Sequence, residues 1–222
     1  MKSELPSIPE RLAAVRSELP NHVTLVAVSK TKPQTAIESA ASTGQIEFGE
    51  NRAAELAEKA SELASLNLRW HHIGHLQTKK VKQVVPHAHL IHAVDSERLL
   101  LEIEKRSASI GKVSDVLLQI HIAQESSKFG WSFSEFDTFL QAQSWNELKH
   151  VRIRGLMGMA TFTDDHQQIR SEFQSLKKAF DTTSSIGSSW DTLSMGMSGD
   201  WKIAVDEGST MVRIGSSIFG SR

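Results

Sequence analysis

The sequence contains no cysteine and no tyrosine among its 222 residues. Without cysteine the chain can form no disulfide, no thiolate metal site and no cysteine nucleophile, and this composition fits a reducing compartment. Without tyrosine no mechanism can use a phenol as its acid or base. Any chemistry of the protein must therefore come from other side chains.

Long hydrophobic runs and an excess of one charge are also missing. No apolar stretch approaches the about 20 residues of a membrane span, and the N-terminal MKSELPSIPERL lacks the apolar region of a signal peptide. The net charge is −1, and a solvated helix face explains the basic cluster of Lys79, Lys80 and Lys82. We therefore expect a cytoplasmic protein that binds neither membranes nor nucleic acids.

Histidines are concentrated in one part of the chain, since six of them fall between residues 71 and 92. His71 and His72 are adjacent on a predicted strand, so their side chains point to opposite faces and cannot share one inward site. Carboxylates are sparse nearby. We predict no metal site.

Short apolar segments alternate along the chain with longer segments of helical period. Strands are expected at 23–28, 45–49, 68–74, 89–94, 113–122, 151–157, 191–195 and 210–215. Helices are expected at 33–43, 51–64, 77–85, from 95 or 96, from Ser132 to about 143, from Thr163, and at 199–207, with an extra N-terminal helix at 6–19.

Eight strands joined by crossover helices imply a parallel sheet. Closed on itself, this α/β sheet is a (β/α)8 TIM barrel, and 222 residues lies near the lower end of the barrel range. We predict one TIM-barrel domain over residues 1–222, with the extra helix covering the barrel bottom. An open doubly wound sheet is the alternative, but SKTKP after the first strand is not a glycine-rich dinucleotide loop.

Lys30 ends the first apolar strand, where a TIM barrel gathers its chemistry. A lysine at this position is commonly a salt-bridge or phosphate partner. The alternative is a Schiff-base lysine, because desolvation and nearby cations depress the pKa of an amine and free its lone pair to attack a carbonyl. The local sequence leaves both interpretations open.

The last two strand ends predict an anion site. Ser198 and Gly199 would open a short helix after the seventh strand, and Gly215 and Ser216 follow the eighth. Bare N–H groups and a helix N-terminus bind phosphate. The alternative is that these glycines only form tight turns.

Arg213 and His75 are the remaining candidates from the strand ends. Arg213 lies two residues before Gly215 and so shares its inward face, where it needs a partner. That partner is either a structural acid, such as Glu47 or Asp206, or a ligand's ring nitrogen or phosphate. His75 is either a ligand contact or a hydrogen-bonding residue of its loop.

The chain resembles the pyridoxal phosphate (PLP) homeostasis protein family, of the alanine-racemase-type barrel class, essentially from end to end. The segments that carry the resemblance are VAVSKTKP (26–33), FGENR (48–52), WHHIGHLQTKK (70–80), GLMGMAT (155–161), LSMGMSGDWKIAV (193–205) and GSTMVRIGSSIFGSR (208–222). The last two are highly specific.

The resemblance implies a monomeric or weakly associating barrel that holds one PLP. Lys30 matches the family's Schiff-base lysine, and Arg213 matches the residue facing the pyridine nitrogen. The phosphate cradle is matched by Ser198, Gly215 and Ser216, and the lining of the cofactor pocket by Asn51 and His75. The departures from the family pattern are Arg52 for a frequent Tyr, His72 for Phe, Lys79 for Asn, Phe129 for a small or polar residue, and Ser216 for Thr.

The same resemblance implies a carrier of PLP, with apo-PLP enzymes as candidate transient recipients. A racemase of this barrel class takes its second base, a tyrosine, from a C-terminal β domain. Here no tyrosine occurs and only seven residues follow Gly215. A cationic Arg213 would also make the ring a weaker electron sink. We expect a protein that buffers or delivers PLP; the alternative is a small PLP enzyme, such as an amino-acid racemase.

Overall fold

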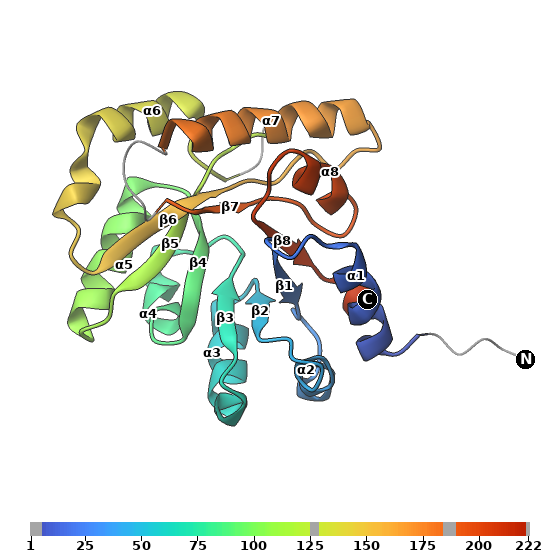
Figure 1. Ribbon diagram of the computed structural model, residues 1–222. Helices are drawn as coiled ribbons and strands as arrows, with labels where there is room; N and C mark the ends of the chain where they lie inside the picture. Colours follow the sequence, from blue (N-terminus) through green and yellow to red (C-terminus); the bar gives the residue numbers. More distant parts are fainter. Residues whose placement is uncertain (1–5, 125–128, 184–189, 221–222) are drawn as a thin grey trace, which may run out of the picture.

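Eight parallel strands form a closed barrel, paired in the order β1 to β8 and back to β1 (Figure 1). The computed structural model describes residues 6–124, 129–183 and 190–220. The (β/α)8 TIM barrel predicted from the alternation of segments is confirmed. The strands are β1 Thr24–Val28, β2 Glu47–Glu50, β3 Arg69–His72, β4 Ala88–Val94, β5 Ser114–Gln119, β6 Val151–Met157, β7 Thr192–Ser194 and β8 Met211–Ile214.

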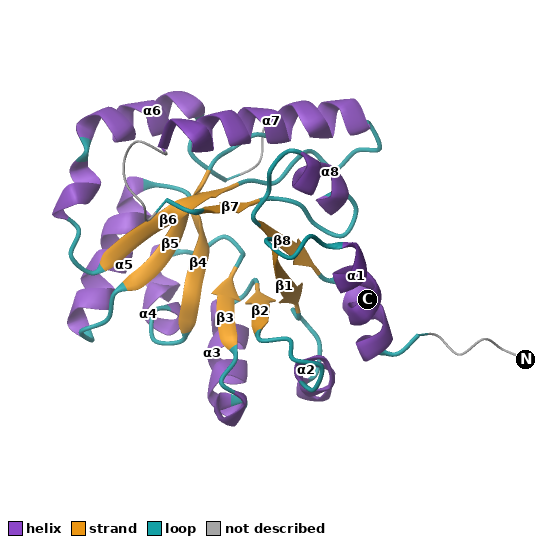
Figure 2. Cartoon of the chain, viewed as in Figure 1, coloured by secondary structure: helices purple, strands orange, loops and turns teal. Residues whose placement is uncertain are grey.

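Helices surround the barrel on its outside (Figure 2). They are α1 Ile8–Glu18, α2 Gln34–Ala41, α3 Ala53–Glu62, α4 Val81–Val84, α5 Glu97–Ser109, α6 Phe133–Ala142, α7 His166–Thr182, α8 Trp201–Asp206 and α9 Ser216–Phe219, with 3-10 turns at Ala64–Leu66, Thr78–Lys80 and Ser144–Glu147. The predicted capping box of Ser132 and Glu135 is present at the start of α6.

Two predicted helices differ clearly from the structure, and one helix was not predicted. The helix expected from Thr163 begins at His166, because the Asp165 carboxylate accepts the backbone N–H groups of Gln167 and Gln168. The segment 77–85 is a 3-10 turn followed by the four-residue helix α4. The short helix α9 after β8 was not predicted.

The N-terminal helix α1 exists as predicted, but it does not cover the barrel bottom. Leu12 and Val15 of α1 belong to a buried cluster with Leu25 of β1 and Val212 of β8. The helix packs against α2 and α9. It therefore covers the outer side of β1 and β8, where the short α9 leaves apolar strand residues to bury.

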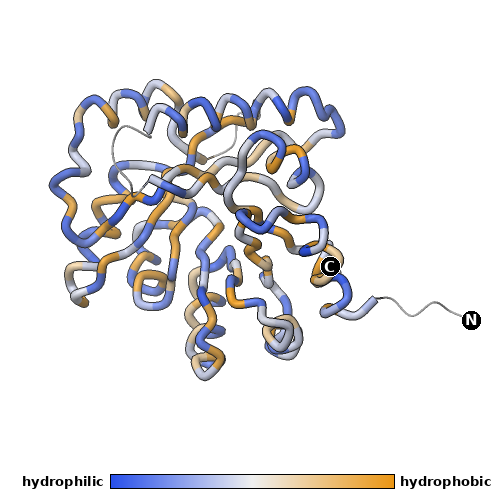
Figure 3. Tube along the Cα trace, in the orientation of Figure 1, coloured by the Kyte–Doolittle hydropathy of each residue, from blue (hydrophilic) through white to orange (hydrophobic). Residues whose placement is uncertain are grey.

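Two apolar layers hold the barrel together. Along the strands hydrophobic residues predominate, whereas helices such as α6 and α7 alternate between hydrophobic and hydrophilic positions (Figure 3). The outer layer joins the strands to the helices. A smaller inner cluster joins β1, β4, β5, β6 and β8, which can meet only inside the barrel; its members are Val26, Leu90, Ala93, Leu117, Met157 and Met211.

Gly155 in the middle of β6 is required by both its backbone angle and its neighbour. Its φ is +143°, and a Cβ at this position would collide with the Thr192 carbonyl oxygen on β7. We therefore expect Gly155→Ala to lower the free energy of unfolding by about 2 kcal/mol or more. Urea denaturation would measure this loss. Gly199→Ala is the control, because a Cβ there meets no atom within 4 Å, and an equal loss in both variants would contradict the explanation.

Candidate functional site

A cavity of about 890 Å³ opens at the carboxyl ends of the strands. Several strand-end loops contribute to its lining, as expected for a TIM-barrel site. All seven residues predicted from the sequence line it: Lys30, Asn51, His75, Ser198, Arg213, Gly215 and Ser216. The structure thus places in one cavity residues that are up to 186 positions apart in the chain (216 − 30).

The residues on both sides of Lys30, Ser29 and Thr31, are held in place by hydrogen bonds to other parts of the chain. The preceding Ser29 donates its hydroxyl to Glu50 Oε1 at 2.7 Å, and its backbone N–H to the Gly49 carbonyl at 3.0 Å. The following residue, Thr31, donates its N–H to Glu55 Oε1 at 2.5 Å and has a φ of +65°. This left-handed turn reverses the chain directly after Lys30.

Lys59 of α3 contacts both of the carboxylates that hold Ser29 and Thr31. Its Nζ lies 2.8 Å from both Glu50 Oε1 and Glu55 Oε1, and 2.9 Å from the Ser29 carbonyl oxygen. Burial raises the pKa of Glu50, against the hydrogen bonds of Lys59 and Ser29. We name Glu50, Glu55 and Lys59 the ion cluster. Sequence analysis missed it, although Glu55 and Lys59 have the i,i+4 spacing of a helical ion pair.

Asn51 lines the cavity with a buried side-chain oxygen, Oδ1, that has no hydrogen-bond partner among the described residues. Its backbone is pressed against Gly74, where a Cβ would collide with the Asn51 carbonyl oxygen. The loops after β2 and β3 therefore approach each other closely because residue 74 is a glycine. An unsatisfied buried oxygen beside a cavity is a group that a ligand can satisfy.

The loops after β7 and β8 are joined by a hydrogen bond, in which the Gly215 N–H donates to Ser198 Oγ at 3.2 Å. The helix after Ser198 begins at Trp201 rather than at Ser198 and Gly199. A Cβ on Gly215 would lie 3.2 Å from the Val28 carbonyl oxygen. The absence of a side chain at Gly215 thus allows β8 to pass close to β1 at the cavity.

Arg213 is 3% exposed and projects from β8 into the cavity. It donates to Ser194 Oγ at 2.5 Å and to the Gly158 carbonyl oxygen at 3.0 Å. Both acids suggested as its partner are wrong, since Glu47 pairs with Arg69 and His71, and Asp206 pairs with Arg170. Burial lowers the pKa of Arg213 to about 10, opposed by the nearby charge of Asp200, so the guanidinium remains charged at neutral pH.

His75 forms part of the cavity wall. Its Nδ1 lies 2.8 Å from Asp95 Oδ2, and its ring stacks on Phe129 with the ring centroids 3.7 Å apart. Phe129, one of the departures from the family pattern, therefore contributes to the same wall. Lys128, its neighbour in the predicted loop, lies outside the described residues.

His72, three residues before His75 in the chain, is buried, and its Nδ1 has no hydrogen-bond partner among the described residues. Burial, together with the charge of His75, lowers its pKa to about 4. The unfolded chain then binds more protons than the folded one between about pH 6.5 and pH 4, so stability falls as the pH falls through this window.

Because this chain has His72 where the family commonly has Phe, we expect its folding stability to decrease at acid pH. We expect wild-type protein to lose about 2 kcal/mol of stability between about pH 7.5 and pH 5 through His72 alone. His72→Phe should remove that part of the loss. Denaturant unfolding of both proteins at the two pH values measures it, and parallel pH profiles would show that His72 is not responsible.

Within residues 6–124, 129–183 and 190–220, no group of three His, Asp or Glu side chains is arranged to hold a metal ion. No helix in the same ranges is long and apolar enough to cross a membrane.

The barrel and its cavity define a class of (β/α)8 proteins with a cavity at the carboxyl ends of the strands. The sequence profile of the family described as "Alanine racemase, N-terminal domain" matches residues 4–222. The pyridoxal phosphate homeostasis protein of Escherichia coli (strain K12) is 39% identical, over 91% of this chain and 87% of its own length. That of Vibrio alginolyticus is 38% identical, over 91% and 88%. The chain therefore belongs to the pyridoxal phosphate homeostasis protein family, as the sequence motifs predicted.

Solved structures agree with this assignment. PipY of Synechococcus elongatus PCC7942 without PLP is 37% identical, with a TM-score of 0.90 over 96% of this chain and 100% of that chain. The same protein with PLP bound has a TM-score of 0.87 at 36% identity over the same shares. An alanine racemase of Clostridium difficile 630, at 15% identity and a TM-score of 0.76 over 97% of this chain and 56% of that chain, shares the fold alone.

Proposed function

We propose that the chain binds PLP in the cavity at the barrel mouth and takes part in PLP (vitamin B6) homeostasis. The observation that carries the proposal is the convergence of a lysine amine, a buried guanidinium and the joined loops at Ser198 and Gly215 in one cavity. The names of the relatives and the PLP-bound PipY structure support it.

The residues present fit this cofactor. Asn51 offers a buried oxygen that still needs a donor. The buried Arg213 has five N–H donors and uses two of them among the described residues, so it can also donate to an aromatic ring nitrogen. Ser198 and Ser216 offer hydroxyl donors to a phosphate, and Ser216 also offers a backbone N–H at the start of α9. Gly215 lines the same cavity, with its own N–H bound to Ser198 Oγ.

Lys30 is the residue proposed to bind PLP covalently. PLP supplies an aldehyde, and the Lys30 nitrogen forms a double bond to the aldehyde carbon with loss of one water molecule, which gives a Schiff base. Hydrolysis returns both partners, as delivery requires. The ion cluster restrains Ser29 and Thr31 and so limits the directions that the Lys30 side chain can take.

A carrier role fits these side chains better than catalysis. Arg213 discourages protonation of the ring nitrogen and weakens the ring as an electron sink. The sequence has no tyrosine to act as a second base. We therefore propose a cytoplasmic, monomeric carrier that keeps the reactive aldehyde bound and transfers it to apo-PLP enzymes, rather than an amino-acid racemase.

The test is reduction of the full chain with borohydride after incubation with PLP. We expect a yellow protein whose colour disappears on reduction, with the added mass on the peptide that contains Lys30. A protein that stays colourless with added PLP would refute the proposal.

The carrier and racemase alternatives are separated by a second measurement. Amino acids are incubated with the PLP-loaded chain in deuterated water, and exchange at Cα is followed by NMR. A carrier should show no sustained exchange, whereas continuing turnover would assign the chain to the enzymes.

A further inference from the structure

A continuous row of polar side chains crosses the barrel interior. Glu47 Oε2 lies 2.7 Å from His71 Nε2, and His71 Nδ1 lies 2.8 Å from His92 Nε2. His92 Nδ1 lies 3.1 Å from Ser194 Oγ, which accepts from Arg213 at 2.5 Å. We name these five residues the polar chain. It joins β2, β3, β4, β7 and β8, and it ends on the arginine of the candidate site.

For a neutral His71, the two ends of the polar chain determine the direction of every hydrogen bond in it. A guanidinium can only donate and a carboxylate can only accept. With Glu47 ionised, His71 Nε2 must carry a hydrogen, so the Nδ1 of a neutral His71 is an acceptor. His92 then donates from Nε2 and accepts at Nδ1 from the Ser194 hydroxyl. In this arrangement both histidines carry their hydrogen on Nε2.

The electrostatics of the barrel interior favour these charge states. Complete burial, together with the charge of Arg213, lowers the pKa of His92 well below its usual value. Burial alone would raise the pKa of Glu47, but the hydrogen bonds of His71 and Arg69 outweigh it and the pKa is lowered. A neutral His92 between an anionic and a cationic end is the arrangement that the hydrogen-bond directions require.

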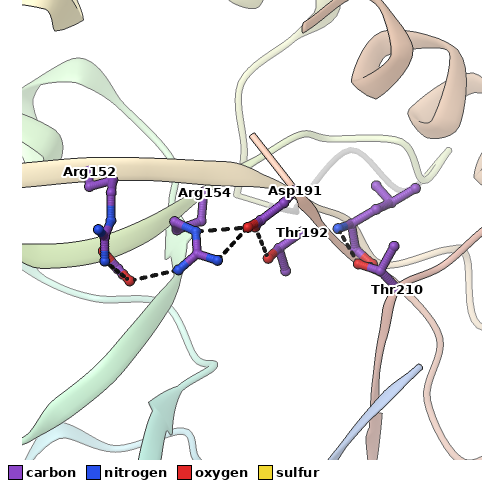
Figure 4. A network of polar contacts seen from close by, with 7 residues as sticks. Arg152, Arg154, Asp191, Thr192 and Thr210 are labelled. Atoms are coloured by element: carbon purple, nitrogen blue, oxygen red, sulfur yellow. Dashed lines mark hydrogen bonds and ion pairs between the residues drawn. The ribbon is translucent and has the colours of Figure 1, made fainter. Parts of the chain in front are cut away.

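The other charged groups around Glu47 lie at the amino ends of the strands, opposite the candidate site. Arg69 donates to Glu47 Oε1 at 2.9 Å, and a small cavity of about 170 Å³ there is lined also by His89, Asp115 and Arg154. Arg154 is held by the carboxylates of Asp115 and Asp191 (Figure 4). Because Arg154 is bound to these two aspartates, the guanidinium that binds Glu47 is that of Arg69.

Among the described residues Arg213 forms no ion pair, although the charge of Asp200 acts on it, and its guanidinium is held by hydrogen bonds to Ser194 and Gly158. Of its two bonds, the one to the Gly158 carbonyl does not involve a titratable partner. The bond to Ser194 is the only one of the two whose strength depends on side chains deeper in the barrel.

We propose that the other four members of the polar chain are positioning residues, which hold the Arg213 guanidinium in one orientation as the donor to the ring of the bound ligand. The inference rests on the proposed function for the identity of that ligand. The orientation itself is a property of the ligand-free chain.

The first test uses the ligand-free full chain labelled with ¹⁵N at histidine. Long-range ¹H–¹⁵N NMR should show His71 and His92, assigned through His71→Asn and His92→Asn, as neutral Nε2–H tautomers. In Glu47→Gln, Arg69 should keep the amide oxygen on its own side and turn the NH₂ group toward His71. Both tautomers should then reverse to Nδ1–H.

The second test uses the PLP complex. Ser194→Ala removes the acceptor of Arg213, and we expect about a tenfold weaker affinity for PLP together with a shifted absorbance maximum of the bound cofactor. Ser107→Ala is the matched control, since Ser107 is equally buried but pairs with Ser114 outside the barrel interior. It should change neither quantity.

Each of the two tests can contradict a different part of the proposal. Unchanged tautomers in Glu47→Gln, or a wild-type His71 or His92 with a hydrogen on Nδ1, would overturn the proposed direction of the polar chain. Ser194→Ala with the same PLP spectrum and affinity as Ser107→Ala would overturn the positioning role. Wild-type protein that binds no PLP would reject the proposed function and with it the ring as ligand, whereas the tautomers would still decide whether the chain orients Arg213.

Discussion

Lys30→Ala should abolish covalent attachment of PLP while leaving the barrel folded. The side chain lies at the cavity, is only partly buried, and supplies the amine on which the attachment depends. Without that amine no imine can form, so the yellow, borohydride-reducible species should be absent. The Asn51, Ser198 and Arg213 groups remain, and we therefore expect PLP to bind only reversibly, in a form that dialysis removes.

Lys82→Ala is the matched control for this variant. Lys82 is exposed on α4 and does not line the cavity. Absorbance spectra and mass spectrometry of both borohydride-treated variants make the comparison, with circular dichroism to confirm the fold. A Lys30→Ala protein that still acquires the PLP mass after reduction would show that another lysine forms the bond.

The barrel could be predicted from sequence because each of its strands is a local signal. The segment 23–28, VTLVAV, is short, apolar and β-branched, and β1 occupies residues 24–28 of it. The errors occur where tertiary contacts decide. The position of α1 outside β1 and β8 follows from the shortness of α9, a four-residue helix that no periodicity could indicate.

The residues of the candidate site could be predicted from the sequence because of the topology of the barrel. Strand ends of a parallel barrel lie on one side, so Lys30 after β1 and Gly215 after β8 had to come together. The alternation of side chains along a strand likewise predicted that Arg213 faces the barrel interior. The side-chain partner of Arg213, which is Ser194, could not be predicted. The hydrogen bonds that connect Arg213 to Glu47 pass through three residues on three other strands.

The ion cluster was missed for a similar reason. Lys59 lies on α3, and nothing local shows that its amine reaches the Ser29 carbonyl 30 positions away. Supporting residues of a site are recognised in a sequence only when they lie within the loop that they support. Lys59 is an outer-helix residue that acts on the turn after β1.

Lys59→Met should therefore affect both stability and PLP binding. The lysine is 6% exposed, and its removal leaves the buried carboxylate of Glu50 without its cation. Loss of one partner from a buried pair typically costs about 3 to 5 kcal/mol, which urea denaturation would measure. The turn of Ser29 and Thr31 would also lose its common anchor, and we expect the affinity for PLP to fall at least about tenfold because Lys30 is no longer restrained.

Two comparisons separate these effects. Lys112→Met removes another lysine that donates to backbone carbonyls, those of Val85 and Ala88, and it should lower stability without weakening PLP binding.

Adding Glu50→Gln to Lys59→Met removes the unpaired charge, so stability should recover in part, because the cost of an unpaired buried carboxylate disappears. PLP affinity should stay low in the double variant, since the amide cannot restore the contact of Lys59 with the Ser29 carbonyl. If affinity recovers together with stability, the ion cluster supports only the fold, and the orientation of Lys30 must be set by the turn itself.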